Sequence, residues 1–218
     1  MSLGTQRPGR FSNSALARVL RCVTTMSRVL LWPLQCYRSG MTTPQIRAAT
    51  EYDASAIAAV HRAAFPAEEC ETIATLSARL LSEVTEPPTL NYVATIDERV
   101  IGHVAYSPLT LAQQPDWSGY LLSPVGVDPS LQAAGIGSAL IRRGLEDLAR
   151  QRVQWVFVYG DPAYYGRFGF DAALAESFVT PHPLAMPFGW QALPLVDHGT
   201  ETAGQLGCVA ALDDAGLW

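Results

Sequence analysis

Two stretches in the first half of the chain carry apolar residues at helical spacing. Residues 53–65, "DASAIAAVHRAAF", and residues 69–84, "ECETIATLSARLLSEV", place them three or four positions apart. This spacing gathers the apolar side chains on one face, so both stretches are predicted to be amphipathic helices. Asp53 stands at the expected N-cap of the first helix, and Pro66 and Pro87 end the two helices.

Other segments show strand patterns. Residues 45–50 are a short strand candidate, and residues 91–96 and 100–111 are predicted to form a hairpin around the turn "DER". Residues 117–127, "WSGYLLSPVGV", are predicted to be a strand that Pro124 interrupts. Because proline has no N–H to donate to a ladder, we expect a bulge or a local parting of strands there.

A glycine turn then leads into a helix predicted from about Gly135 to Arg152, followed by the buried-strand pattern "QWVFVYG" at 154–160. Together with residues 121–127 this makes a β-α-β crossover, so its strands are parallel and its connection is right-handed. The other strands are expected to be antiparallel. Helical turns at 161–170 and short strands near 189–195 and 206–212 complete the series. The predicted fold class is α/β, a single domain with a mixed, mostly antiparallel sheet, one parallel crossover and flanking helices.

Charge divides the chain at Met41. Residues 1–40 contain six arginines and no acidic residue, whereas the rest contains nine arginines and 20 acidic residues, a net charge of −11. We expect residues 1–40 to be an extension outside the fold and residues 41–218 to be the domain. The extension is interpreted as upstream sequence from a start codon assigned too early, as a targeting or membrane-surface segment, or as part of the domain, and these alternatives stay open.

Composition narrows the function classes. The net charge is −5 and all 15 basic residues are arginine, without a basic run, so nucleic-acid binding is not expected. The four cysteines show no C-x-x-C spacing, which favours reduced thiols in a cytoplasmic protein. The four histidines form no close cluster with cysteine or carboxylate, so no metal site is expected. The apolar part of the extension is too short and too interrupted to span a bilayer, and no membrane partner is expected for the domain.

The stretch "LQAAGIGSALIRRG", residues 131–144, carries candidate chemistry. Unpaired N–H groups at a helix N-terminus attract anions, and small residues let a pyrophosphate approach the backbone. A P-loop requires lysine, and a dinucleotide fingerprint requires a third glycine where Leu140 stands. The pattern V-x-x-x-x-Q-x-x-G-x-G fits instead, at Val127, Gln132, Gly135 and Gly137. The alternative is that the glycines only permit a tight turn and close helix packing.

With these motifs, the chain resembles a GNAT-type N-acetyltransferase of the acyl-CoA-dependent superfamily. "VGVDPSLQAAGIGSALI" is similar to the acyl-CoA motif of that superfamily, and "YYGRFGF", residues 164–170, is similar to its Y-x-x-x-G-F element. "GDPAYYGRFGF" and "IGHVAYSP" make the resemblance one to a YhbS-like bacterial branch, over roughly residues 45–195.

The resemblance implies that the strands ending near Val127 and Tyr159 splay apart and that the pantetheine arm of acetyl-CoA lies between them. It implies the following cofactor-binding residues: Val125, Val127, Gln132, Ala133, Ala134, Gly135, Ile136, Gly137 and Ser138. Arg142 and Arg143 could reach the adenosine phosphate, and a solvated helix face is the alternative for both.

The resemblance also implies a catalytic residue. Aligned on Gly169, the tyrosine of the family falls on Tyr165, which is expected to donate a proton to the departing thiolate. Tyr164 is expected to point elsewhere, and a backbone N–H near Val125 is expected to stabilise the oxyanion. The general base is left open among Glu68, Glu69, Asp116, His103, a water chain or an amine that arrives neutral.

The predicted function is transfer of an acetyl group from acetyl-CoA to a primary amine of a small molecule or peptide. The alternative is a non-catalytic acyl-CoA-binding sensor or interaction module. Whether the chain forms a homodimer stays open. Four aromatic residues are candidates to line the acceptor pocket, with core packing as the alternative: Trp117, Tyr120, Phe188 and Trp190.

Overall fold

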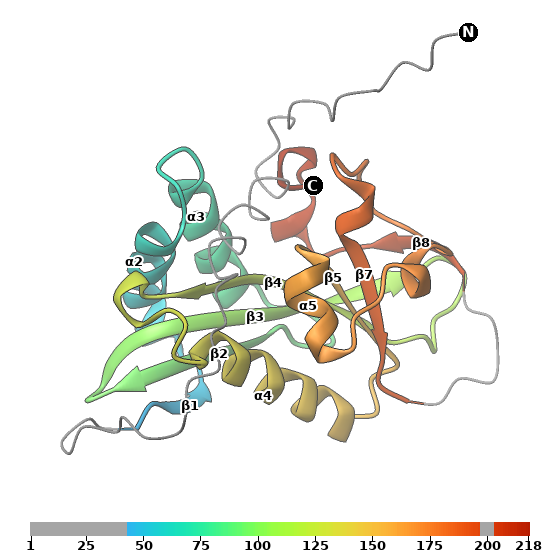
Figure 1. Cartoon of the computed structure of the whole chain (residues 1–218). Helices are drawn as coiled ribbons and strands as arrows, with labels where there is room; N and C mark the ends of the chain where they lie inside the picture. Colours follow the sequence, from blue (N-terminus) through green and yellow to red (C-terminus); the bar gives the residue numbers. More distant parts are fainter. Residues whose placement is uncertain (1–42, 197–202) are drawn as a thin grey trace, which may run out of the picture.

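The computed structural model describes residues 43–196 and 203–218. Six strands lie side by side in the order β1-β2-β3-β4-β5-β7 (Figure 1). Their bounds are, in chain order, Gln45–Ala48, Leu90–Ile96, Arg99–Leu111, Gly119–Val127, Trp155–Tyr159 and Trp190–Pro194. Two short strands lie off this path: β8 (Gly204–Gly207) pairs with the end of β3, and β6 (Phe178–Val179) pairs with β8.

The pairing pattern matches the predicted topology. β2 and β3 form an antiparallel hairpin, and its turn residues Asp97 and Glu98 have φ angles of 47° and 65°. β4 and β5 are parallel and are joined through α4 (Ile136–Arg150), as the crossover required. The small β6–β8 pair is also parallel, which differs from the expectation that all other strands would be antiparallel.

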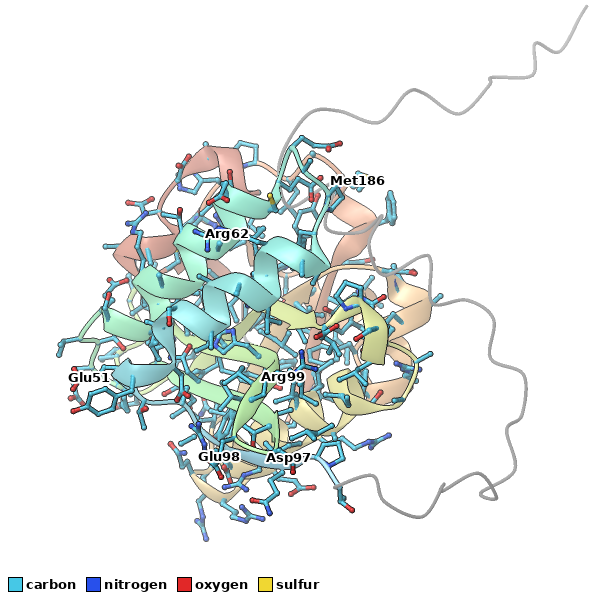
Figure 2. All side chains as sticks on the ribbon, turned by 90° about the vertical axis from the view of Figure 1, so that its left-hand side faces the viewer. Glu51, Arg62, Asp97, Glu98, Arg99 and Met186 are labelled. Atoms are coloured by element: carbon cyan, nitrogen blue, oxygen red, sulfur yellow. The ribbon has the colours of Figure 1, made fainter. Side chains whose placement is uncertain are left out.

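Helices cover both faces of the sheet. α2 (Ala54–Ala64) and α3 (Cys70–Ser82) lie on one face, and α4 lies on the other with α5 (Pro162–Tyr165). Figure 2 looks onto α2 and α3, with Arg62 on their outer side, Met186 at the top and the β2–β3 turn at the bottom.

Two apolar clusters fill the two faces. One lies under α3 and the C-terminal segment and contains Leu121, Phe157 and Trp190; the other lies under α4 and α5 and contains Tyr106 and Leu122. A smaller apolar cluster packs α2 against β2. Since alternate residues of β4 enter different clusters, the strand is buried on both faces, as its nearly continuous apolar pattern indicates.

Asp53 precedes α2 as predicted but does not cap that helix with its side chain. Its carboxylate accepts hydrogen bonds from the Thr50 backbone N–H at 2.8 Å and from both terminal nitrogens of Arg47, also at 2.8 Å. The capping box therefore belongs to the short 3-10 helix Glu51–Asp53, and the Arg47 guanidinium holds the pKa of Asp53 well below its usual value.

The C-terminal segment differs most from its sequence pattern. The strand expected near 206–212 lies at Gly204–Gly207, and Ala210–Leu212 is a 3-10 helix. The Trp218 side chain is buried, and its indole N–H donates to the Leu212 carbonyl at 3.0 Å. Residues 1–40, predicted to be an extension, lie outside the described residues.

Candidate active site

β4 loses one of its two neighbours part-way along its length. Ser123 and Pro124 together stand opposite the single residue Ala105 of β3, which makes a bulge. Parallel pairing with β5 ends immediately before this bulge, at Leu122 and Val158. The predicted bulge and parting of strands at Pro124 are thus both present.

Beyond the bulge, the last residues of β4 pair only with β3 among the strands that the structure describes. The Asp128 N–H donates to the Ile101 carbonyl at 2.9 Å. Since the backbone groups of an antiparallel strand alternate in direction, Gly126 then faces β3, whereas Val125 and Val127 direct their N–H and C=O groups away from it. The two valines therefore form a backbone edge on the side where β5 has ended.

The glycine turn continues directly from this edge. The Gln132 amide donates to the Val127 carbonyl at 3.3 Å, which ties the turn to the end of β4. Gly135 is the N-cap of α4 and has a φ of 82°, a left-handed conformation that favours glycine. A Cβ built on Gly135 would meet nothing within 4 Å, so the space beside this backbone is open. The residues of the turn itself, Ala133, Ala134 and Gly135, are exposed.

The first turn of α4 adds hydrogen-bond donors to the site. Ala139 is the first residue whose N–H is bonded within the helix, to the Gly135 carbonyl at 2.9 Å. The N–H groups of Ile136, Gly137 and Ser138 precede it at the positive end of the helix dipole. This is an arrangement that binds phosphate groups.

Tyr164 and Tyr165 follow β5 in a short helix that Asp161 caps, and their rings meet edge to face with centroids 5.0 Å apart. The Tyr165 ring packs against Gly160, the first residue after β5, and is only 2% exposed. Burial raises the pKa of Tyr165, so its hydroxyl keeps its proton at neutral pH. The Tyr164 hydroxyl instead lies 3.2 Å from the position of a Cβ on Gly137. Tyr164 does point elsewhere, as expected, but it points toward the glycine turn.

Arg167 is a residue at this site that the sequence analysis missed. Its guanidinium lies 4.1 Å from the centre of the Tyr164 ring and donates to the Ser138 hydroxyl at 3.2 Å. A positive charge therefore stands over the start of α4. The only signal in the sequence was its place between Tyr165 and Gly169.

The two arginines that the sequence analysis considered have other contacts. Arg143 is paired with Asp147 at 2.8 Å, and its guanidinium lies over the Tyr92 ring. Arg142 is exposed, and its guanidinium lies 5.3 Å from the centre of the Phe168 ring. Both arginines therefore lie on a solvated part of α4, and Arg143 is in addition paired with a carboxylate.

Among the open candidates for a general base, His103 belongs to a buried chain of hydrogen bonds. The Asn91 amide nitrogen donates to the Leu80 carbonyl, so its oxygen accepts from His103 Nε2 at 3.2 Å. His103 Nδ1 then accepts from His61 Nε2 at 2.8 Å. His61 Nδ1 is left as an acceptor without a donor among the described residues, 2.8 Å from where a Cβ on Gly126 would lie. Both ring nitrogens of His103 are engaged, which leaves neither for a substrate amine.

The carboxylates on the same shortlist differ in exposure. Glu68 and Asp116 are exposed, whereas Glu69, at the start of α3, is 2% exposed. No group of three or more histidine, cysteine or carboxylate side chains that could hold a metal occurs within the described ranges. In the same ranges, no helix has the length and apolar character needed to cross a membrane.

The four aromatic candidates for the acceptor pocket do not share one site. Tyr120 faces the α4 side, where its hydroxyl donates to the Pro88 carbonyl at 3.1 Å. Trp117 packs against Gly119 and the α3-side cluster. Phe188 and Trp190 line an open pocket beside β7. The expectation of one pocket from all four is therefore wrong, because Tyr120 and Trp190 face opposite sides of the sheet.

The profile of a family described as "Acetyltransferase (GNAT) domain" matches residues 45–173, more than half of the chain. The chain belongs to the GNAT family of acetyltransferases. The predicted family, fold class and enzyme class are confirmed. The match includes β4, the glycine turn, α4, β5 and both tyrosines of α5, the elements that form the candidate site.

Two N-acetyltransferases of Escherichia coli K12 are similar to this GNAT chain in sequence. YhbS is 35% identical over 132 residues, which are 59% of this chain and 74% of YhbS. YjhQ is 33% identical over 113 residues, 51% of this chain and 62% of YjhQ, so the match spans less than two thirds of YjhQ.

Two solved GNAT structures are similar in fold. Escherichia coli YhbS in complex with CoA has a TM-score of 0.67 and 27% identity, and the match covers 82% of this chain and 96% of that one. A GNAT acetyltransferase from Brucella melitensis in complex with acetyl-CoA has a TM-score of 0.60 and 30% identity, covering 78% of this chain and 99% of that one. These likenesses support the YhbS-like branch that the sequence motifs indicated.

Proposed function

We propose that this protein moves an acetyl group from acetyl-CoA to a primary amine of a small molecule or peptide, by direct attack in a ternary complex. One observation carries the proposal: the edge of β4 that is freed beyond Leu122 leads into the glycine turn that begins α4. The backbone edge suits the amide groups of pantetheine, and the helix start at its end suits a pyrophosphate. The CoA and acetyl-CoA complexes of the similar chains support this choice of donor.

Each part of the site has one role in this proposal. Val125 and Val127 pair with pantetheine as a neighbouring strand would. The residues from Gln132 to Ser138 surround the pyrophosphate with N–H groups. Arg167 adds a positive charge beside Ser138, which strengthens the attraction for a phosphate group.

The transfer forms one bond and breaks another. The amine nitrogen, in its neutral form, attacks the thioester carbonyl carbon, and the N–C bond forms while the C–S bond breaks. The Val125 N–H stabilises the carbonyl oxygen as negative charge develops there. Tyr165 gives its proton to the departing thiolate, the proton lost by the amine goes to water, and the Tyr165 phenolate then takes a proton back from water.

Burial of Tyr165 affects this step in two ways. It keeps the phenol protonated, which is the form that can donate. It also makes the phenol a weaker acid, so transfer needs a thiolate that the same apolar surroundings have made more basic. The two effects oppose each other, and the position of the hydroxyl decides whether the proton is delivered.

The test is Tyr165→Phe, which keeps the ring and removes the hydroxyl. A positioned general acid contributes about 100- to 10,000-fold, so kcat should fall by roughly 100-fold when chemistry limits the rate. The dissociation constant of acetyl-CoA should stay within about tenfold, because one hydrogen bond contributes about 0.5–1.5 kcal/mol. Release of the CoA thiol measures turnover, and calorimetry measures binding.

Tyr164→Phe is the matched comparison, because Tyr164 is the adjacent buried tyrosine and its hydroxyl lies at Gly137 in the glycine turn. This variant should raise the KM for acetyl-CoA a few-fold and leave kcat nearly unchanged. Full activity of Tyr165→Phe with chemistry shown to be rate-limiting would make water the proton source. Binding of acetyl-CoA without turnover of any amine would favour the acyl-CoA-binding module.

We further propose that the catalytic domain comprises residues 41–218 and that the enzyme works in the cytoplasm. The continuous series of strands and helices from Gln45 onward supports the first statement. The cysteine pattern supports the second.

A further inference from the structure

An open pocket of about 610 Å³ lies beside β7, within the segment that leads from α5 into that strand. Its lining comes from the 3-10 helix Ala173–Ala175, from β6 and from the 3-10 helix Pro187–Gly189. A volume of this size holds a small organic molecule.

The lining has a distinct chemistry. Three lining side chains are buried and apolar: Ala175, Phe178 and Trp190. Phe188 and Val179 also line the pocket and are 59% and 56% exposed, so the lining presents accessible apolar surface. Glu176 supplies a carboxylate, and no basic residue is among the lining residues. The pocket therefore favours an apolar molecule that carries no negative charge.

Trp190 adds an aromatic ring to this lining. Its side chain is 5% exposed, and its indole N–H finds no acceptor among the described residues. Because the indole nitrogen itself has almost no accessible surface, Trp190 offers a ligand the apolar part of its ring.

The residues that form one wall of the pocket are hydrogen-bonded to the end of β5, where the proposed reaction takes place. Trp190 pairs with Tyr159, the last residue of β5, and the Gly160 N–H donates to the Gly189 carbonyl at 2.9 Å. Gly160 is also the residue against which the Tyr165 ring packs. One backbone segment thus separates the pocket wall from the tyrosine.

We propose that this pocket holds the apolar body of the acceptor, and that the acceptor is an aromatic or branched alkyl primary amine without a carboxylate. This inference rests on the proposed function and names its substrate class. The body lies against Phe178, Phe188 and Trp190, and the amine extends past Gly189 toward the thioester. The bonds made and broken are those of the transfer described above.

The test compares phenethylamine, tyramine and ethanolamine as acceptors in the full chain with acetyl-CoA. The two aromatic amines should have a kcat/KM at least tenfold above that of ethanolamine. Phe188→Ala should raise the KM for phenethylamine roughly tenfold and change kcat/KM for ethanolamine less than twofold. Val84→Ala is the matched control, because Val84 is 98% exposed and is not among the pocket residues. It should change neither value.

Glu176→Gln tests the charge selection. Phenylalanine carries a carboxylate that the wild-type pocket should reject, and the variant should use it several-fold better relative to phenethylamine. Unchanged constants for phenethylamine in Phe188→Ala, with all amines still acetylated, would overturn the pocket assignment and leave the proposed function intact.

A binding measurement separates the two proposals when no amine is acetylated. Phenethylamine alone should raise the melting temperature of the wild type, and Phe188→Ala should abolish the shift. That result would support the pocket as a site for apolar amines while the transferase assignment fails. No shift in the wild type would overturn the pocket assignment.

Discussion

The buried histidine chain predicts a steep loss of stability in mild acid. His61 and His103 are both fully buried. Burial lowers the pKa of His61 to about 3, and burial together with the neighbouring His61 lowers that of His103 well below its usual 6.5, although the Asp53 charge opposes this. The unfolded chain takes up protons on both imidazoles below pH 6.5, whereas the folded chain cannot. The stability that the neutral pair contributes is therefore present above pH 6.5 and is lost as the pH falls.

The size of the effect follows from linkage. A pH of 5 is about 1.5 units below the pKa of an imidazole in the unfolded chain. Proton uptake by the unfolded chain then lowers the free energy of unfolding by about 2 kcal/mol per histidine. Two histidines that stay neutral in the folded state give about 4 kcal/mol between pH 7.5 and pH 5. This is a large part of the roughly 5–15 kcal/mol that stabilises an ordinary domain. Asp53 does not contribute in this window. The stability that its ionised carboxylate contributes is lost only when the pH falls to about its ordinary pKa of 3.8.

Urea unfolding at pH 7.5 and pH 5.0 measures the effect. The free energy of unfolding of the wild type should fall by about 4 kcal/mol, and that of the double variant His61→Leu, His103→Leu should fall much less. The double variant has no proton to gain at these positions, so the comparison uses the slope with pH and not the absolute stability. Equal slopes in both proteins would show that the imidazoles are solvated or charged in the folded state.

Three further predictions follow from single positions. Gly144→Ala would place a Cβ against the Tyr106 ring, which is buried and cannot move easily because its hydroxyl donates to the Ile141 carbonyl. The variant should lower the free energy of unfolding by about 1–3 kcal/mol, although alanine favours helices. Its control is Gly166→Ala, where a Cβ would meet nothing within 4 Å and urea unfolding should show little change. Gly135→Val fills the open space beside the turn, so acetyl-CoA should no longer raise the melting temperature of the variant. The wild type should gain about 2.7 kcal/mol of stability when the acetyl-CoA concentration is 100 times the dissociation constant. Unchanged binding by the folded variant would show that the turn is not part of the site. A chain beginning at Met41 should melt and bind acetyl-CoA as the full chain does, and a marked drop in melting temperature would place residues 1–40 in the fold.

The sequence predicted those parts of the fold that local patterns determine. The β2–β3 hairpin and the crossover through α4 have strong apolar periodicity and glycine, proline or charged turns at their ends. Pro124 indicated the bulge because its missing N–H is a local property. The C-terminal strand was misplaced because β8 is short and is held by two pairs with the end of β3, contacts that no local pattern records.

The candidate site likewise has parts that local sequence patterns predicted and parts that they did not. The backbone around Gly135 was predictable, since a left-handed turn before a helix has a clear sequence signature. The directions of Tyr164 and Arg167 were not, because they depend on how α5 packs across the start of α4. The separation of Tyr120 from Trp190 likewise depends on the register of β4, β5 and β7, which no local pattern records.

The parting of β4 from β5 follows from the bulge in β4 itself. Closing the two strands would make hydrogen bonds that an incoming ligand would then have to break, at about 1 kcal/mol each. The bulge at Ser123 and Pro124 prevents that closure, so the cost of separation belongs to folding and not to binding. The sheet is in this sense preorganised: a ligand that takes the place of the missing strand keeps its full interaction energy, and its affinity is not reduced by the work of making room.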